Sequence, residues 1–316
     1  MEGKIRFAPS PTGYLHEGHL LSALYVWAAA RKWGLQIHLR IEDHDQGRAR
    51  TEYIDSIYED LEWFGFRWDS QSIQSARTAL YEAALEGLQK RGLVYPCYCS
   101  RKQLEAENPK SETGEIVYRG KCFLRHTEAL RSKAKISMDT LVASRLRCDE
   151  QVPSALRCDE QPHNLRIVIP DKVIHWHDMR LGDFNENPKL QCGDFPIRDR
   201  EGQWTYQFAV CVDDIEEGIT HIVRGEDIRS STARQIALMR LLGRETPPLY
   251  LHHPLIVDPA GKKLSKRERA HSLRQDRDAG ITAEEILGRV CHKAGFLPNS
   301  TPLSLENAIS IVEQSL

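Results

Sequence analysis

Short apolar runs alternate with amphipathic segments along the first 90 residues of the chain. Residues 4–8 indicate a strand that ends in a Pro-rich loop. From Leu20 to about Lys32 apolar residues recur at helical spacing, Gly34 ends that helix, and residues 36–41 (QIHLRI) indicate the next strand. This strand–loop–helix–strand unit has the size of one right-handed crossover between parallel strands.

Two further amphipathic helices are predicted, one with Thr51 as its N-cap and one after Ser75. Because strands and helices alternate, we expect an α/β protein with a Rossmann-like, doubly wound parallel sheet.

The periodicity fades between Gly92 and about Leu165, which predicts an insertion between two halves of the sheet. LRCDEQ occurs there twice, at residues 146–151 and 156–161, too few copies for a repeat fold, so we interpret it as a polar connector. Strand-like runs return at residues 165–169 and 205–212, a helix fits residues 232–242, and the chain is helical by pattern beyond Thr282.

These patterns predict four segments. Residues 1–92 and 166–243 would form the two halves of a catalytic domain, residues 93–165 the insertion, and residues 244–316 a basic loop followed by a helical region.

Composition narrows the class of protein. The chain has 316 residues and a net charge of −2, and no apolar run approaches the roughly 18–20 residues that span a bilayer. The N-terminus lacks the apolar core of a secretory signal, so we expect a cytoplasmic protein. Since the net charge gives no overall nucleic-acid signal, any RNA site must be a local basic patch. Candidate residues for such a patch are Lys262, Lys263, Lys266, Arg267 and Arg269.

Two motifs carry the strongest chemical signal. His16 and His19 flank Gly18 where a strand-end loop meets a helix N-terminus, a place where backbone N–H groups and the helix dipole favour phosphate. A second motif, KLSKR at residues 263–267, offers cations suited to charge that develops on a triphosphate. Either motif alone is commonly incidental or a solvated face. Both are expected at the same edge of one sheet, and together they predict a nucleotide site.

FAPSPTGYLHEGH (residues 7–19) and KLSKR resemble the two nucleotide-binding motifs of class I aminoacyl-tRNA synthetases of the glutamyl/glutaminyl branch. The resemblance continues through RIEDHD (40–45), TYQFAVCVDD (205–214) and THIVRGEDI (220–228), so it covers most of the chain. It implies that ATP, with Mg²⁺, lies between the histidines and Lys266, and that His16, His19 and Lys266 are catalytic. The implied ATP-binding residues are Pro9, His16, Gly18, His19, Lys263, Ser265 and Lys266.

One departure concerns Glu17, where many relatives carry an apolar residue. We expect its side chain to point away from the phosphates.

The resemblance also implies an amino-acid pocket for a dicarboxylic substrate. Its residues would be Arg6, Ala8, Ser10, Glu42, Tyr206 and Arg224. Two arginines can bind two carboxylates in bidentate fashion, while Glu42 pairs with the ammonium. Arg6 would take the side-chain carboxylate and Arg224 the α-carboxylate, or the reverse. Asp43, His44 and Asp45 are expected to support the loop.

A third constellation is Cys97, Cys99, Tyr118 and Cys122. Spacing alone leaves a metal site and free cysteines in a loop equally open. The same pattern occurs in the insertion of glutamyl-Q tRNA(Asp) synthetases, so the resemblance implies one structural Zn²⁺. Cys148 and Cys158 have no partner at metal spacing and are expected to be inert or weakly reactive.

Only residues 268–316 follow the KLSKR motif, whereas a separate domain typically needs about 100 residues. We therefore expect a helical stem-contact region and no anticodon-binding domain. This arrangement resembles glutamyl-Q tRNA(Asp) synthetases, which transfer glutamate to the queuosine base at the wobble position of tRNA(Asp). The implied activity is that of a ligase acting on L-glutamate, ATP and queuosine-containing tRNA(Asp).

Three alternatives stay open at this point. A shortened glutamyl-tRNA synthetase would charge a 3′ end. An HxGH-type nucleotidyltransferase would act on a small metabolite, but such chains lack the set of Arg6, Glu42, Tyr206 and Arg224. A zinc-stapled RNA-binding module would leave both ATP motifs unexplained.

Overall fold

The computed structural model describes residues 3–112, 114–134, 162–256 and 271–316. Both LRCDEQ copies, with Cys148 and Cys158, and the whole KLSKR motif, with Lys263, Ser265, Lys266 and the rest of the predicted basic patch, lie outside these residues. Within the described ranges, no helix is both long enough and apolar enough to cross a membrane.

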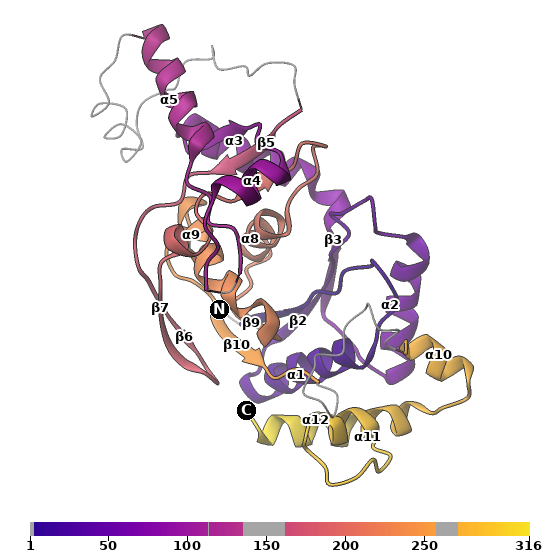
Figure 1. Cartoon of the computed structure of the whole chain (residues 1–316). Coiled ribbons are helices and arrows are strands. Elements are labelled where there is room, and N and C mark those ends of the chain that lie inside the picture. Colours follow the sequence, from indigo (N-terminus) through magenta and orange to yellow (C-terminus); the bar gives the residue numbers. More distant parts are fainter. Residues whose placement is uncertain (1–2, 113, 135–161, 257–270) are drawn as a thin grey trace.

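The core of the molecule is a seven-stranded sheet (Figure 1). In sheet order its strands are β3 (Ser70–Ile73), β2 (Gln36–Ile41), β1 (Lys4–Phe7), β9 (His221–Gly225), β10 (Leu249–His253), β6 (Ile174–Asp178) and β7 (Gly182–Glu186). Neighbouring strands are parallel except for β6 and β7, which pair antiparallel. The chain runs outward from β1 to β3 and resumes on the other side of β1 with β9, so the switch point lies between β1 and β9. This confirms the predicted α/β fold with a mostly parallel central sheet.

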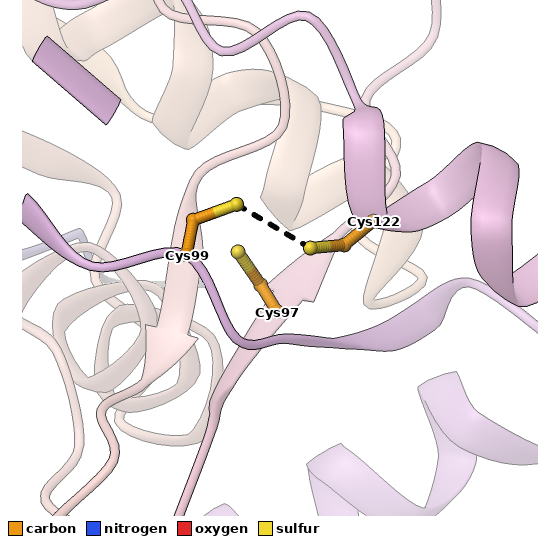
Figure 2. A group of neighbouring side chains, drawn as sticks. All are labelled: Cys97, Cys99 and Cys122. Atoms are coloured by element: carbon orange, nitrogen blue, oxygen red, sulfur yellow. Dashed lines mark hydrogen bonds between the residues drawn. The ribbon is translucent and has the colours of Figure 1, made fainter. Parts of the chain in front are cut away.

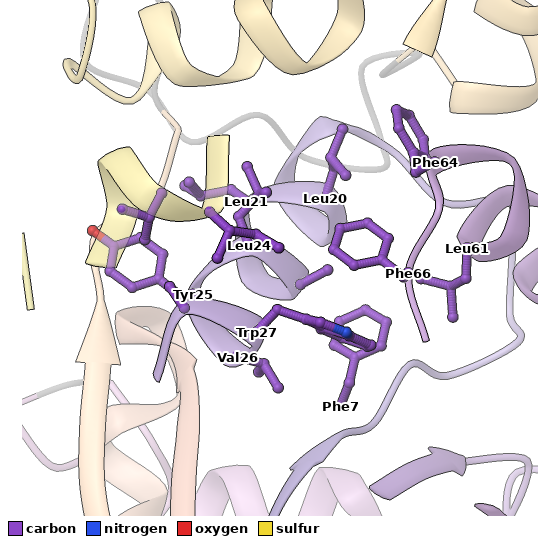
Figure 3. Packing of buried hydrophobic residues seen from close by; sticks show 14 of the residues in the cluster. Phe7, Leu20, Leu21, Leu24, Tyr25, Val26, Trp27, Leu61, Phe64 and Phe66 are labelled. Atoms are coloured by element: carbon purple, nitrogen blue, oxygen red, sulfur yellow. The ribbon is translucent and has the colours of Figure 1, made fainter. Parts of the chain in front are cut away.

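Side chains of successive strand residues point to opposite faces of this sheet, and each face has its own apolar core. Ile222 of β9 belongs to one core and Val223 to the other. One core is formed with α1 (Glu17–Trp33), α2 (Thr51–Phe64), α11 (Ala283–Lys293) and α12 (Leu305–Gln314), and the other with α3 (Thr78–Lys90), α8 (Tyr206–Glu216) and α9 (Thr232–Leu241). Figure 3 shows α1 packing its apolar side chains against Phe7 and Phe66.

A second, antiparallel sheet of three strands lies beside the large one. Its strands are β4 (Val94–Cys97), β5 (Asn164–Ile167) and β8 (Pro196–Arg198). The run predicted at residues 165–169 therefore forms a strand of this small sheet and does not resume the large one. Two helices of the insertion, α4 (Arg101–Glu107) and α5 (Lys121–Ala134), lie at this end of the molecule (Figure 1). The remaining short elements are η1 (Gln74–Arg77), α7 (Pro188–Gln191), η2 (Glu226–Ser231) and α10 (Leu273–Asp278).

One predicted element is wrong in type. Residues 205–212 were expected as a strand, but they begin α8, which runs from Tyr206 to Glu216. An unbroken apolar run indicates burial without distinguishing a buried strand from a helix that is covered on most sides. The segment from Phe208 to Asp214 is buried throughout, which is why no helical period is visible in its sequence.

The other predicted elements are confirmed with small changes at their ends. Thr51 is the first residue of α2, and Arg50 occupies the N-cap position. The helix expected after Ser75 begins with the 3-10 turn η1 before α3.

Candidate active site

Both histidines of the nucleotide motif are held by the backbone at the start of α1. His16 is the N-cap, and its Nδ1 accepts a hydrogen bond from the backbone N–H of Gly18 at 3.1 Å. Nδ1 of His19 accepts from the backbone N–H of His16 at 3.2 Å. Because Nδ1 is the acceptor in each ring, the neutral imidazole carries its proton on Nε2. Two Nε2–H donors therefore accompany the positive end of the α1 dipole, an arrangement that suits phosphate oxygens.

Gly18 makes room for the ring of His16. A Cβ at this position would lie 2.9 Å from His16 Cε1 and 3.1 Å from its Nδ1. Real Cβ contacts shorter than 3.0 Å essentially do not occur, so with any other residue at position 18 the imidazole would have to shift.

The structure describes the chain on either side of the KLSKR motif, and the segment after the motif contacts His16. Before the motif, β10 ends at His253, at the same sheet edge as the ends of β1 and β9. After it, Ser272 forms a β-bridge with His16, and the backbone N–H of Leu273 donates to the carbonyl of Leu15 at 2.9 Å. The described segment that follows the KLSKR motif in sequence is thus paired with the histidine motif through backbone contacts of Ser272 and Leu273.

Glu17 points away from the motif, as expected. Its carboxylate pairs with Arg289 Nε at 2.6 Å and with Lys293 Nζ at 2.6 Å, both on α11. The anion is therefore compensated by the C-terminal helices.

Four predicted pocket residues gather where β1, β2 and β9 meet α8. Arg6, Glu42 and Arg224 are each 4% exposed, and Tyr206 begins α8. Burial raises the pKa of Tyr206, and Arg224, Glu42 and Arg6 all act on it electrostatically, so the four groups share one environment. Burial also raises the pKa of Glu42, against the opposing charges of Arg40 and Arg6.

The loop after β1 supplies the remaining predicted residues. Pro9 is buried, and its carbonyl accepts from the backbone N–H of Glu42 at 3.0 Å, while Ala8 and Ser10 are partly buried beside it. Asp43 accepts from the backbone N–H of Ser75 at 2.8 Å, and His44 Nδ1 lies 2.7 Å from Gln74 Oε1. Asp43 and His44 thus tie the loop after β2 to η1, in agreement with the supporting role predicted for them.

Sequence reasoning missed the fully buried Arg40, which orders the pocket charges. Arg40 donates from Nε and Nη2 to Glu42 at 3.3 and 3.2 Å, and from Nη1 to Asp214 and Glu217, each at 2.8 Å. Asp214 also accepts from Arg6 Nε at 3.2 Å. A signal was present in QIHLRI, because polar side chains alternate there with the apolar residues that face the α1 core.

Arg224 has a separate set of partners that the sequence did not indicate. Nη1 donates to Gln235 Oε1 at 2.7 Å, Nη2 to Thr232 Oγ1 at 2.8 Å, and Nε to His252 Nε2 at 3.0 Å. Two arginines from neighbouring strands, a carboxylate and a phenol together match the charges of an amino acid with an acidic side chain.

The predicted metal residues form a compact cluster in the insertion. The three sulfurs of Cys97, Cys99 and Cys122 lie within 4.8 Å of one another (Figure 2). Tyr118 Oη lies 3.7 Å from Cys97 Sγ and 3.9 Å from Cys99 Sγ. The tyrosine is held by Gly193, where φ is +67° and a Cβ would lie 2.1 Å from the Tyr118 carbonyl.

This donor set fits zinc. A tetrahedral site with Zn–S bonds of about 2.3 Å separates its sulfurs by about 3.8 Å, and Cys99 and Cys122 are 3.5 Å apart. Cys97 lowers the pKa of Cys122, which favours its thiolate, whereas Cys122 raises the pKa of Cys97 and burial raises that of Cys99, so a metal would have to displace the protons of these two thiols.

Comparison with known proteins places this geometry in a family. Residues 3–302 match the family described as tRNA synthetases class I (E and Q), catalytic domain. The crystal structure of glutamate-tRNA synthetase from Elizabethkingia anophelis superposes with a TM-score of 0.71 at 25% identity, covering 99% of this chain and 66% of that one. This chain thus spans slightly less than two thirds of the solved enzyme.

Similar sequences span nearly the same length as this chain. The protein of Nitratidesulfovibrio vulgaris named Glutamyl-Q tRNA(Asp) synthetase is 36% identical, covering 97% of this chain and 91% of its own. Proteins of the same name from Neisseria gonorrhoeae and Geobacter sulfurreducens are 40% and 38% identical, covering 85% and 96% of this chain and 81% and 87% of their own. By its sequence and fold, the chain therefore belongs to the class I tRNA synthetases of the E and Q branch, and among them to the glutamyl-Q tRNA(Asp) synthetases.

Proposed function

We propose that this chain uses ATP to activate L-glutamate as glutamyl-adenylate and transfers the glutamyl group to queuosine in the anticodon of tRNA(Asp). The observation that carries this proposal is the shared environment of Arg6, Glu42, Tyr206 and Arg224 at the switch point of the sheet. The relatives' name, Glutamyl-Q tRNA(Asp) synthetase, describes a product that carries a glutamyl group, and glutamate has the charges that this pocket matches.

In the activation step, ATP enters with Mg²⁺ and its phosphates lie at the N-terminus of α1. An oxygen of the α-carboxylate of glutamate attacks the α-phosphorus of ATP. The bond between the α-phosphorus and the oxygen that bridges it to the β-phosphate breaks, and pyrophosphate leaves. Nε2–H donors of His16 and His19 stabilise the charge on the phosphate oxygens, and Lys266, with Lys263 and Ser265, acts from the loop that follows β10. The protein contributes positioning and electrostatics, without a covalent enzyme intermediate.

In the pocket, Glu42 binds the ammonium of glutamate. Arg6 already uses Nε and Nη1 for hydrogen bonds to Asp214 and the Val223 carbonyl, and Nη2 takes part in neither bond. We assign Arg6 to the side-chain carboxylate and Arg224 to the α-carboxylate. Glutamine would present an amide N–H₂ to one arginine and leave it partly unpaired, which costs about 1–3 kcal/mol.

In the transfer step, a hydroxyl on the cyclopentene ring of queuosine attacks the acyl carbon of the adenylate. AMP leaves with the electron pair of the broken anhydride bond, and the hydroxyl proton passes to solvent. Bases that can be splayed out of a single-stranded loop are the usual targets of sequence-specific RNA recognition, and the anticodon loop offers such a base.

We further propose one structural Zn²⁺ bound by Cys97, Cys99, Tyr118 and Cys122. Zinc would hold the loop after β4 and the first turn of α5 together, because Cys99 precedes α4 and Cys122 lies at the start of α5. Its contribution is to folding and not to the reaction.

Transfer of labelled glutamate tests the proposed acceptor. We expect label on queuosine-containing tRNA(Asp) even after its 3′-terminal adenosine has been removed enzymatically, and no label on tRNA(Asp) that lacks queuosine. Label on intact tRNA(Glu) but not on the trimmed tRNA(Asp) would identify a synthetase that charges a 3′ end. ATP–pyrophosphate exchange that does not depend on glutamate would reject the amino-acid pocket as well.

A further inference from the structure

A row of buried hydrogen bonds leads from Asp178, at the end of β6, through His252 on β10 to Arg224 on β9. Asp178 Oδ2 lies 2.6 Å from His252 Nδ1, and His252 Nε2 accepts from Arg224 Nε at 3.0 Å. Asp178 and His252 are 0% exposed. None of the sequence motifs includes Asp178 or His252.

The surroundings of Asp178 require a side chain with two hydrogen-bond acceptors, which is an ionised carboxylate. Its Oδ1 accepts from the backbone N–H groups of Arg180 at 3.0 Å and Leu181 at 2.9 Å, and Oδ2 accepts from the backbone N–H of His252 at 3.0 Å as well as from its ring. Each oxygen thus faces two donors, so an amide would set an N–H₂ against N–H groups in either orientation.

The ring of His252 is consequently set in one tautomer. Nδ1 carries the proton that Asp178 accepts, which leaves Nε2 unprotonated as the acceptor for Arg224. The opposite tautomer, or a doubly protonated ring, would point an N–H at the Nε–H of Arg224. Burial lowers the pKa of His252, with Arg224 acting in the same direction and Asp178 opposing, so the neutral ring is favoured.

With His252 as acceptor, three bonds fix the plane of the Arg224 guanidinium. The other two acceptors are Gln235 and Thr232. One further N–H on each Nη takes part in none of these bonds, and these two donors are those that a substrate carboxylate can use.

We propose that Asp178 and His252 are positioning residues for the amino-acid substrate: Asp178 selects the His252 tautomer, and His252 orients Arg224 toward a carboxylate of glutamate. This inference rests on the proposed function, in which Arg224 binds glutamate.

Two substitutions of His252 separate positioning from general stability. His252→Leu removes the acceptor, and because a hydrogen bond to a buried charge is lost, the KM for glutamate in pyrophosphate exchange should rise about tenfold to a hundredfold. His252→Gln can place Oε1 near the position of Nε2, so most of the glutamate affinity should return. The KM for ATP should stay within about twofold of wild type in both variants.

His253→Gln is the matched control. His253 is the next residue of β10, equally buried, but it stacks on Tyr25 at 4.8 Å and hydrogen-bonds the Pro254 carbonyl. The His253→Gln variant should have the same KM for glutamate as the wild type even if its melting temperature is lower.

The outcomes are distinct. A wild-type protein without glutamate-dependent exchange would refute the proposed function itself. An active wild type with an unchanged glutamate KM in His252→Leu, or a parallel rise of both KM values, would overturn the positioning role alone. If His252→Leu does not fold, ¹⁵N NMR of histidine-labelled wild type decides, with the signal assigned through His252→Gln: protonated Nδ1 and unprotonated Nε2 support the inference, and any other state overturns it.

Discussion

At the scale of single residues, the nucleotide motif depends on the absence of a side chain at Gly18. His16 can cap α1 with its ring over the backbone only because Gly18 has no Cβ, which would lie 2.9 Å from the imidazole. Gly18 is one of the implied ATP-binding residues. The structure adds that the absence of a Cβ at Gly18 leaves room for the His16 ring, which is both the N-cap of α1 and part of the proposed phosphate site.

Gly18→Ala should therefore separate activity from stability. Displacement of the His16 ring should slow glutamate-dependent pyrophosphate exchange on the order of a hundredfold, the usual cost of one misplaced electrostatic group. Alanine favours a helix over glycine by about 0.5–1 kcal/mol, which offsets part of the lost cap, so the melting temperature should change little. Gly87→Ala in α3, where a Cβ meets nothing within 4 Å, is the control and should keep full activity. Full exchange activity in Gly18→Ala would reject the role of His16.

At the scale of elements, α8 is attached to the sheet by charges. Glu217, the C-cap of α8, accepts from Arg40 on β2 at 2.8 Å and from Ser72 on β3 at 2.6 Å, and His38 of β2 lies 3.2 Å away. Burial acts to raise the pKa of Glu217, but the hydrogen bond to His38, the charge of Arg40 and the Ser72 hydroxyl outweigh it and lower the pKa to about 2. Because these contacts hold Arg40, they also support the pocket around Glu42.

The stability that Glu217 contributes should depend on pH. Its folded pKa of about 2 lies below the ordinary 4.5, so the ionised side chain stabilises the fold fully above pH 4.5, and this contribution is lost as the pH falls toward 2. The shift corresponds to on the order of 3 kcal/mol. In urea unfolding, Glu217→Gln should be less stable than wild type at pH 7, with a difference that shrinks below about pH 4.5. Glu216→Gln, at the exposed neighbouring residue, should show no such trend.

At the scale of the whole molecule, the proposed active site and the cysteine cluster belong to different sheets. Among the described residues, those proposed for ATP and glutamate lie at the edge of the seven-stranded sheet, whereas Cys97 ends β4 of the small sheet. The cluster is buried with its own few apolar neighbours, separate from the two large cores. A metal there would stabilise the insertion without reaching the reacting atoms.

Loss of zinc should accordingly loosen the insertion first. Cys99→Ser should release zinc during purification and lower the first of two thermal transitions, while glutamate-dependent pyrophosphate exchange persists, because a structural zinc contributes to folding directly. Zinc content by elemental analysis and calorimetry measure both effects. Cys291→Ser, which changes a buried thiol of α11, should retain the metal. Wild-type protein purified without chelators and free of zinc would contradict the site.

The sequence alone determined the local elements and the motifs. Residues 36–41 form a strand with the predicted ends, and Gly34 closes α1 in the left-handed conformation, because such features depend on neighbours along the chain. The nucleotide motif and the cysteine spacing could be recognised for the same reason. Their residues lie close in sequence, and few other functions require these residue types at this spacing.

Tertiary structure decided what depends on residues far apart in the chain. Residues 205–212 begin a helix, and their sequence shows no helical period because that helix is buried on most sides. The strand Asn164–Ile167 belongs to the small sheet because its pairing partner β4 is determined by the tertiary structure. Arg40 and His252 acquired their roles only through Asp214 and Arg224, which are 174 and 28 residues away. No local pattern encodes such contacts, because a buried charge is placed by whichever distant partner compensates it.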